Sequence, residues 1–137
     1  METLFSAAGM LAMAGWVTLL VAPGWRPGNW AFAGLAMPAL LAALYAVLLA
    51  RFAPGAEGGF SSLADVAALF RTEGVLLAGW VHYLAFDLFI GAWICRRGTE
   101  EGMNPWLLRL CLPPTFLAGP IGLLLFFGLR LLGRGGR

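Results

Sequence analysis

Long runs of apolar residues, separated by short polar connections, make up most of this chain. Four runs cover residues 4–22, 29–52, 74–96 and 106–132, and each is near the roughly 20 residues that a helix needs to cross about 30 Å of hydrocarbon. The connections after the first and third runs are short, so consecutive helices should be antiparallel neighbours. The pattern predicts an all-α integral membrane protein, an up-and-down four-helix bundle with both termini and Arg130 on the same side.

The first run begins close to the N-terminus, where a signal peptide would also be apolar. Only the acidic Glu2 precedes it, no basic segment accompanies it, and three similar runs follow along the chain. We therefore expect this run to be a retained span.

Prolines predict irregularities in two of these helices. Pro38 lies inside the second run, where its missing N–H and its clash with the carbonyl four residues earlier should bend the helix. The fourth run contains Pro113-Pro114 and then Gly119-Pro120, so we expect it to be broken at both places.

The longer connection between the second and third runs contains a helix-start signal within SSLADVAALFR. Ser62 precedes Asp65 by three residues, which is a variant of the capping box. Leu63, Val66 and Phe70 then recur at helical spacing. We predict a short helix along the membrane interface, although an ordinary surface helix would fit the pattern almost as well.

The composition supports the membrane assignment. Hydrophobic residues make up 61% and charged residues 12% of the chain, against about 45–50% and about 25% in soluble domains. A net charge of +2 is too small to indicate a nucleic-acid partner, and residues 1–137 are predicted to form a single transmembrane domain. All nine basic residues are arginine, which, with the abundance of Ala, Gly and Leu, suggests a GC-rich bacterial genome and hence the inner (cytoplasmic) membrane.

The chain offers no conventional metal or cofactor site. Its single histidine cannot form a usual zinc site or a bis-histidine haem, and no GxSxG, Walker, CxxC or HExxH motif occurs. Cys95 and Cys111 fall at or inside apolar runs, so we expect two buried free thiols rather than a disulfide. No metal and no cofactor are predicted.

The third run, GWVHYLAFDLFIGAWI at its centre, carries an acid where the hydrocarbon should be. Asp87 lies about 20 Å along a helix that starts at Gly74, and a carboxylate at such a depth costs about 2.5–3.5 kcal/mol. It should therefore face the bundle and be either paired or protonated. Desolvation favours the neutral form, which can donate a proton.

A helical wheel separates the neighbours of Asp87. At about 100° per residue, Trp80, Tyr83 and Gly91 fall within about 40° of it, and Gly91 should leave room beside the carboxyl. His82 points about 140° away, so a direct dyad between His82 and Asp87 is not expected.

Structural roles are the alternative for each of these residues. Asp87 could make a hydrogen bond that only holds a neighbouring helix, and His82 could be a packing residue or extend to the interface. Trp80 and Trp93 fit core or lipid-facing positions more readily than a site, whereas Tyr83 fits either role.

The fourth run could supply partners for the acid. Its prolines, Pro114 among them, free backbone carbonyls one turn upstream, and Thr115 adds a hydroxyl. Non-helical backbone at membrane depth is tolerated only where it is buried in protein or lines a cavity, so an internal pocket is one interpretation and a simple kink is the other. Tyr45, on the second run, could reach the same pocket.

Two segments together resemble a known family: HYLAFDLFIGAWI and LPPTFLAGPIGLLLF. The end of the first run, APGWR, and the connection EGGFSSLADVAALF fit as well, so the likeness extends over about residues 4–132. The chain resembles the ABA4-like family of small four-span membrane proteins, whose plant relatives are linked to the formation of neoxanthin from violaxanthin.

The resemblance implies a role with a carotenoid, such as a xanthophyll, or another isoprenoid lipid, and a cofactor-free isomerase as the activity. Turning an epoxide into an allenic alcohol needs one proton delivered to oxygen and another removed from a chain carbon. Asp87 would act as the acid, helped by Tyr83, with His82 as the base. The predicted lining of the slot for the polyene is formed by Trp80, Gly91, Trp93, Tyr45, Thr115 and Pro114.

Two other classes of function remain open. The protein could bind a carotenoid or isoprenoid without converting it, as an accessory subunit. It could also be a small proton-coupled transporter, for which a midplane acid is natural, but four short spans would then need to assemble as a homo-oligomer.

Overall fold

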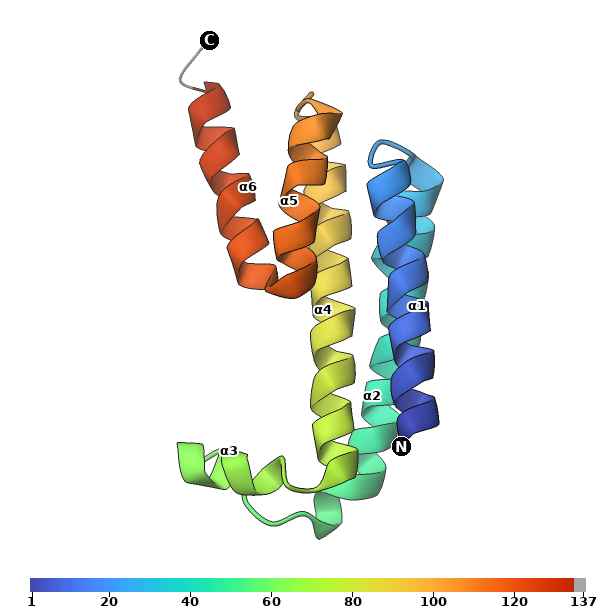
Figure 1. The fold of residues 1–137 in the computed structure, drawn as a ribbon, viewed down its shortest axis with the longest axis vertical. Coiled ribbons are helices and arrows are strands. Elements are labelled where there is room, and N and C mark those ends of the chain that lie inside the picture. Colours follow the sequence, from blue (N-terminus) through green and yellow to red (C-terminus); the bar gives the residue numbers. More distant parts are fainter. Residues whose placement is uncertain (135–137) are drawn as a thin grey trace.

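Three long helices form the body of the molecule. The computed structural model of the protein describes residues 1–134. Helix α1 (Glu2–Val21), the continuous helix formed by η1 (Pro27–Ala36) and α2 (Met37–Phe52), and α4 (Glu73–Glu100) are each long and apolar enough to cross a membrane. They run alternately up and down, side by side (Figure 1). Together they indicate an integral membrane protein.

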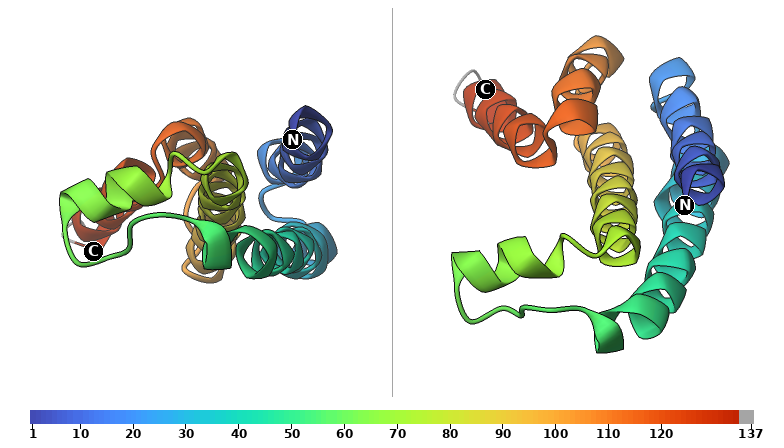
Figure 2. Two further views of the ribbon diagram at one scale, coloured as in Figure 1. Left: turned by 90° about the horizontal axis from the view of Figure 1, so that it is seen from below. Right: turned by 60° about the horizontal axis from the view of Figure 1, so that its bottom comes forward.

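Helix α4 occupies the centre of this arrangement. Within its most apolar window, 56% of the residues are buried, against 28% in each of the other two long helices. It packs on α1 and α2 on one side and on the C-terminal helices on the other (Figures 1 and 2). Trp16, Leu19, Leu41 and Leu88 are fully buried between α1, α2 and α4, because apolar side chains of all three helices meet there.

The second long helix changes type along its length. Its first part, η1, is π-helical, with Pro27 in the first turn, where a missing N–H does no harm. The chain becomes α-helical at Met37, one residue before Pro38. The change of helix type thus lies next to Pro38, the position at which the sequence predicts a bend.

The short helix predicted between the second and third spans is present as α3 (Leu63–Leu69). Its N-cap is the one that the sequence indicates, since the Asp65 N–H donates to Ser62 Oγ at 3.1 Å. The helix extends across the end of the bundle on the same side of α4 as the C-terminal helices (Figure 2). Phe60 and Leu63 are largely exposed there, as expected for a helix that rests on a membrane surface.

The fourth apolar run differs from the prediction. It forms two helices, α5 (Pro105–Leu117) and α6 (Gly119–Arg134), separated by Ala118 alone. Helix α5 runs back along α4 for part of its length, and α6 then reverses direction and returns (Figure 1). At about 1.5 Å per residue, a helix of 13 residues is about 20 Å long and too short to cross the hydrocarbon. The run is a helical hairpin, and the start of α1 and the end of α6 lie at opposite ends of the molecule (Figure 1).

Three expectations are corrected by this hairpin. The bundle is not a simple up-and-down arrangement of four crossing helices. Arg130 pairs with Glu101 at the C-terminal end of α4, which lies away from the N-terminus (Figure 1). Pro113-Pro114 does not break the helix but lies inside α5, whereas the predicted break at Gly119-Pro120 is present. Apolar length alone could not separate one long helix from two shorter ones, because both bury the same kind of side chain.

The hairpin packs on α4 through a second, smaller core formed by Ile94, Leu108, Cys111 and Phe126. Cys95 and Cys111 are both buried and not bonded to each other, which confirms the expectation of two free thiols.

The hairpin predicts that the two ends of the chain lie on opposite sides of the membrane. Single cysteines introduced as Thr3→Cys and Gly133→Cys should be labelled by a membrane-impermeant thiol reagent from opposite faces, tested in right-side-out and inverted vesicles. Cys95 and Cys111 should give little background because they are buried.

Glu57→Cys, in the exposed connection before α3, serves as the reference and should follow Thr3→Cys. Labelling of Thr3→Cys and Gly133→Cys from the same face would contradict the hairpin.

Candidate functional site

The candidate site lies where α5 ends and α6 begins, against the middle of α4. Asp87 is only 8% exposed, although it is an acid in an apolar helix. Its carboxyl group lies within hydrogen-bonding reach of the Gly119 backbone, at the first residue of α6. A Cβ at position 119 would overlap Asp87 Oδ1, so only glycine allows this approach. The carboxyl therefore caps the N-terminus of α6, where unpaired N–H groups and the helix dipole favour an acceptor.

Tyr83 serves the other end of the break. It lies one helical turn before Asp87, and its hydroxyl donates to the Leu117 carbonyl at 2.6 Å, with the Phe116 carbonyl at 3.3 Å. These are carbonyls of the last turn of α5, which have no partner within the helix. Two side chains of α4, one turn apart, thus satisfy the end of α5 and the start of α6. In hydrocarbon an unpaired backbone group costs several kcal/mol, so the pair explains how the chain can turn there.

One carboxyl oxygen is left over. Oδ2 of Asp87 is buried and has no hydrogen-bond partner among the described residues. The Tyr83 hydroxyl is also within reach of the carboxyl, but its single proton points to the Leu117 carbonyl. Its oxygen can therefore accept a hydrogen bond from a protonated Asp87. The carboxyl is thus held beside Gly119 and Tyr83, and Oδ2 has no partner among the described residues.

An aromatic row connects this acid to a cavity. Phe5 stacks on Trp80 with ring centroids 5.7 Å apart, and Trp80 stacks on Tyr83 at 5.3 Å. Phe5, Leu76 and Trp80 line a largely apolar cavity of about 360 Å³ between the start of α1 and the start of α4, with Glu2 and Glu73 also in its lining. The row thus leads from the cavity to Asp87.

Gly91, expected to leave space beside the acid, is covered instead. The indole of Trp16, from α1, packs on it so closely that a Cβ at position 91 would lie 2.7 Å from the ring. The same indole meets Phe116 edge-on at 5.4 Å. Gly91 therefore provides close packing between α1 and α4 and no room for a ligand.

His82, on another face of α4, lies against Tyr45 of α2. Their ring centroids are 5.4 Å apart, and His82 also lies 4.6 Å from the ring of Phe86. Asp87 is not part of this group, in agreement with the angular separation read from the sequence.

The remaining predicted residues hold the hairpin. Trp93 meets the rings of Phe126 and Phe127 edge-on, at 5.5 and 6.1 Å, and so packs α6 on α4. Thr115 is fully buried, and its hydroxyl donates to the Cys111 carbonyl at 2.7 Å. The Pro114 carbonyl accepts from the Ala118 N–H at 2.9 Å, at the end of α5.

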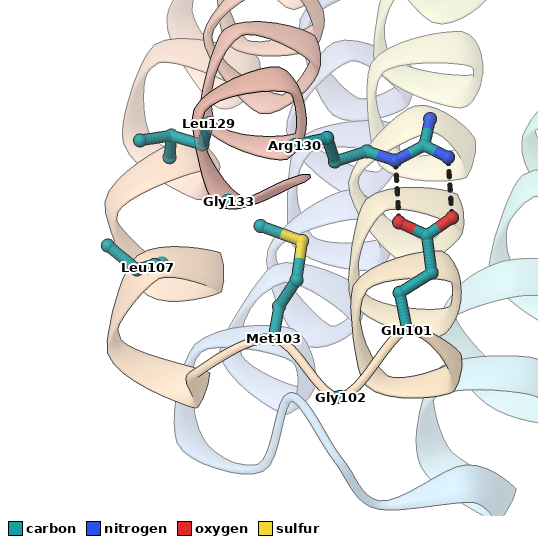
Figure 3. A pocket seen from close by; sticks show the side chains of 7 residues that line it. All are labelled: Glu101, Gly102, Met103, Leu107, Leu129, Arg130 and Gly133. Carbon is teal, nitrogen blue, oxygen red and sulfur yellow. Dashed lines mark hydrogen bonds and ion pairs between the residues drawn. The ribbon is translucent and has the colours of Figure 1, made fainter. Parts of the chain in front are cut away.

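The far end of the hairpin is fixed by arginines. Arg130, on α6, donates to both carboxyl oxygens of Glu101, at 2.6 Å from Nε, beside a cavity of about 400 Å³ (Figure 3). Arg109, on α5, donates to the last carbonyls of α1, at 2.9 Å to Leu20 and 3.1 Å to Val21. The cavity beside Arg130 is larger than the one beside Trp80. It adjoins the ion pair of Arg130 with Glu101 and lies away from Asp87.

Sequence reasoning did not find Gly119, Leu117 or Phe116 as members of the site. All three contribute backbone atoms to the site, and residue type does not show which backbone atoms will do so. The Gly-Pro pair at 119–120 was the one available signal, since it predicts a new helix start. Among residues 1–134, no group of three or more His, Cys, Asp or Glu side chains could hold a metal ion.

Comparison with known proteins identifies one family. The sequence profile described as ABA DEFICIENT 4-like matches residues 3–126. No curated protein and no solved structure matches the chain.

The close packing of α5 on α6 gives a test of the hairpin. A Cβ at Gly122 would lie 2.5 Å from the Thr115 backbone nitrogen, and backbone cannot rotate away. Gly122→Ala should therefore lower the free energy of unfolding by about 1–3 kcal/mol, measured as thermal unfolding in detergent.

Gly128→Ala is the matched control, because it lies on the same helix and a Cβ there would meet nothing within 4 Å. It should be neutral or slightly stabilising. Equal stability of the two variants would show that α5 and α6 are not packed as described.

Proposed function

Since this chain belongs to the ABA4-like family, we propose that it is a membrane-embedded, cofactor-free isomerase of a carotenoid or related isoprenoid lipid, with Asp87 as the proton-transfer group. The observation that supports this proposal is the buried carboxyl whose Oδ1 side is held at the start of α6 while Oδ2 has no partner among the described residues.

A single carboxyl can supply both proton transfers of an epoxide-to-allene isomerisation. Protonated Asp87 gives its proton to the epoxide oxygen as the C–O bond on the polyene side breaks, and the oxygen becomes a hydroxyl. The carboxylate then takes a proton from the neighbouring vinylic carbon, and that C–H electron pair forms the second cumulated double bond. One proton is gained at oxygen and one is lost from carbon, so the formula is unchanged and the acid is regenerated.

The neighbours of Asp87 suit this cycle. The carboxylate formed midway would face the N-terminus of α6 and the Gly119 N–H, which stabilise negative charge. The Tyr83 hydroxyl, held by the Leu117 carbonyl, would fix the carboxyl in one orientation. This scheme does not need His82 as the base, which is consistent with its position against Tyr45 and Phe86.

The route for the substrate would be the aromatic row. Phe5 and Trp80 are partly exposed on the outside of the bundle, where lipid would surround the protein. The largely apolar cavity beside them has room for one end of a polyene, with the Trp80–Tyr83 stack directing its oxygenated ring toward Asp87.

A non-catalytic pigment-binding or isoprenoid-binding protein is the second candidate. The observation that favours it is that Asp87 and Tyr83 have a structural task, since they satisfy both ends of the break between α5 and α6. An acid kept for this purpose alone would need no substrate.

A small proton-coupled transporter is the third candidate. It is favoured by two helix ends that meet inside the apolar region next to an acid, an arrangement that transporters use to bind ions and substrates.

Asp87→Asn separates the catalytic from the structural role. Asparagine keeps an oxygen acceptor for the Gly119 backbone but cannot give or take the proton, so folding should be retained while conversion falls by at least about 100-fold. The measurement is pigment chromatography after expression in a host that makes epoxy-carotenoids, with protein level and thermal unfolding recorded for each variant.

His82→Gln is the control and should keep its activity. Pigment that copurifies unchanged with the original protein would favour the binding role, and proton flux in liposomes that Asp87→Asn removes would favour transport. Full conversion by Asp87→Asn would exclude the carboxyl as the acid.

A further inference from the structure

Three adjoining cavities, together called the seam, lie between the second long helix and α4, on a face that does not include Asp87. The seam begins in a polar mouth of about 120 Å³ beside Arg26, Asn29 and Arg96. A narrow middle section, which shares Asn29, Trp30 and Arg96 with the mouth, continues to Gly34 and Phe89. From these two residues an apolar groove of about 350 Å³ extends past Pro38 and Ala42 to Phe86. The seam therefore has one polar end and one apolar end.

The mouth contains two arginines without an acidic partner. The guanidinium of Arg26 lies 5.3 Å, and that of Arg96 4.9 Å, from the ring of Trp30. Neither forms an ion pair among the described residues, and the acid in this lining, Glu100, is paired with Arg97 at 3.6 Å. With no acid paired to either cation among the described residues, an anion in the mouth would be favoured.

Asn29 supplies a second, independent sign of a ligand. It is only 3% exposed, its amide nitrogen donates to the Pro23 carbonyl, and its Oδ1 has no partner among the described residues. A buried acceptor without a donor is destabilising, so a donor from a bound molecule would be favoured. The ligand of the mouth should thus carry both an anion and a hydroxyl or ammonium group.

The groove fits a hydrocarbon chain. Gly34, Ala39, Ala42 and Ala85 present little side chain, while Phe86 and Phe89 provide aromatic contact. From Ala85 to Arg96 the seam follows α4 for about 16 Å at about 1.5 Å per residue, which is half of the roughly 30 Å hydrocarbon thickness. Ala39 and Ala42 are exposed, so the groove opens toward the surrounding lipid.

We infer that this seam binds one phosphate-headed membrane lipid from the leaflet at the Arg26 end. The phosphate lies between Arg26 and Arg96, a hydroxyl or ammonium of the headgroup donates to Asn29 Oδ1, and one chain lies in the groove. A free phosphate would occupy the mouth alone, and a carotenoid without a phosphate would occupy the groove alone. The site does not depend on Asp87 or on the proposed isomerase activity.

Native mass spectrometry of the full chain in detergent tests this inference. The probes are phosphatidylglycerol, diacylglycerol with the same acyl chains, and inorganic phosphate. Phosphatidylglycerol should be retained at least about tenfold more than diacylglycerol, since each charge-assisted hydrogen bond contributes about 1.5–3 kcal/mol. Inorganic phosphate at millimolar concentration should not displace it.

Two pairs of variants give matched controls. Arg26→Gln with Arg96→Gln should lose the retained lipid, whereas Arg51→Gln with Arg71→Gln, which changes the charge equally at the other end of the bundle, should keep it. Ala42→Leu should fill the groove and weaken retention, whereas Ala46→Leu, exposed on the same helix but outside the groove, should not.

Several results would overturn the inference. The first is equal retention of phosphatidylglycerol by the two double arginine variants. The second is binding of diacylglycerol or a carotenoid as strong as that of phosphatidylglycerol. The third is displacement of phosphatidylglycerol by inorganic phosphate together with no effect of Ala42→Leu on retention. Because the alanine substitutions lie on the exposed surface, they test the seam even if the arginine variants fold poorly.

Discussion

A chain that reverses direction inside hydrocarbon must satisfy its own backbone, and this requirement governs the structure. Helix α5 ends and α6 begins with one residue between them, so carbonyls and N–H groups of two helix ends meet where water is absent. Tyr83 donates to a carbonyl at the end of α5, and Asp87 accepts from the N–H at the start of α6. The hairpin, the burial of the acid and the identity of its neighbours all follow from this arrangement.

The same arrangement explains why an acid can have two roles. Capping the start of α6 occupies the Oδ1 side of the carboxyl and leaves Oδ2 buried without a partner. An asparagine or serine could cap a helix as well, so capping alone does not require a group that ionises. The unpartnered Oδ2 is the observation on which the proposed proton-transfer role of Asp87 rests.

Helix α4 has different chemistry on two of its faces. One face meets the hairpin and carries Tyr83 and Asp87, while another meets η1 and α2 and ends at Arg96. The π-helical form of η1 matters for the second face, because its wider turns accompany the close approach of Gly34 to Ala92. Polar groups at membrane depth and at the membrane surface are thereby kept apart, and His82 lies with neither, against Tyr45 and Phe86.

Local patterns in the sequence determined the helices and their faces. Apolar length predicted four crossing helices, of which three are present within a few residues. Ser62 and Asp65 predicted the start of α3, and the 100° spacing separated His82 from Asp87. Each of these depends on residues a few positions apart, whose hydrogen bonds and side-chain directions are fixed by helix geometry. The buried state of Cys95 and Cys111 followed from the same apolar runs.

The tertiary structure decided what those helices do with one another. Whether residues 106–132 cross once or turn back depends on partners 34 positions away, as in the hydrogen bond from Tyr83 to Leu117. The partners of Asp87 are backbone atoms, and the space beside Gly91 is taken by an indole from another helix. The sequence determined that an acid would be buried in α4, because the residues around Asp87 in this helix are mostly apolar. Only the packing of the hairpin decided what the acid would face, because backbone groups carry no signature of residue type.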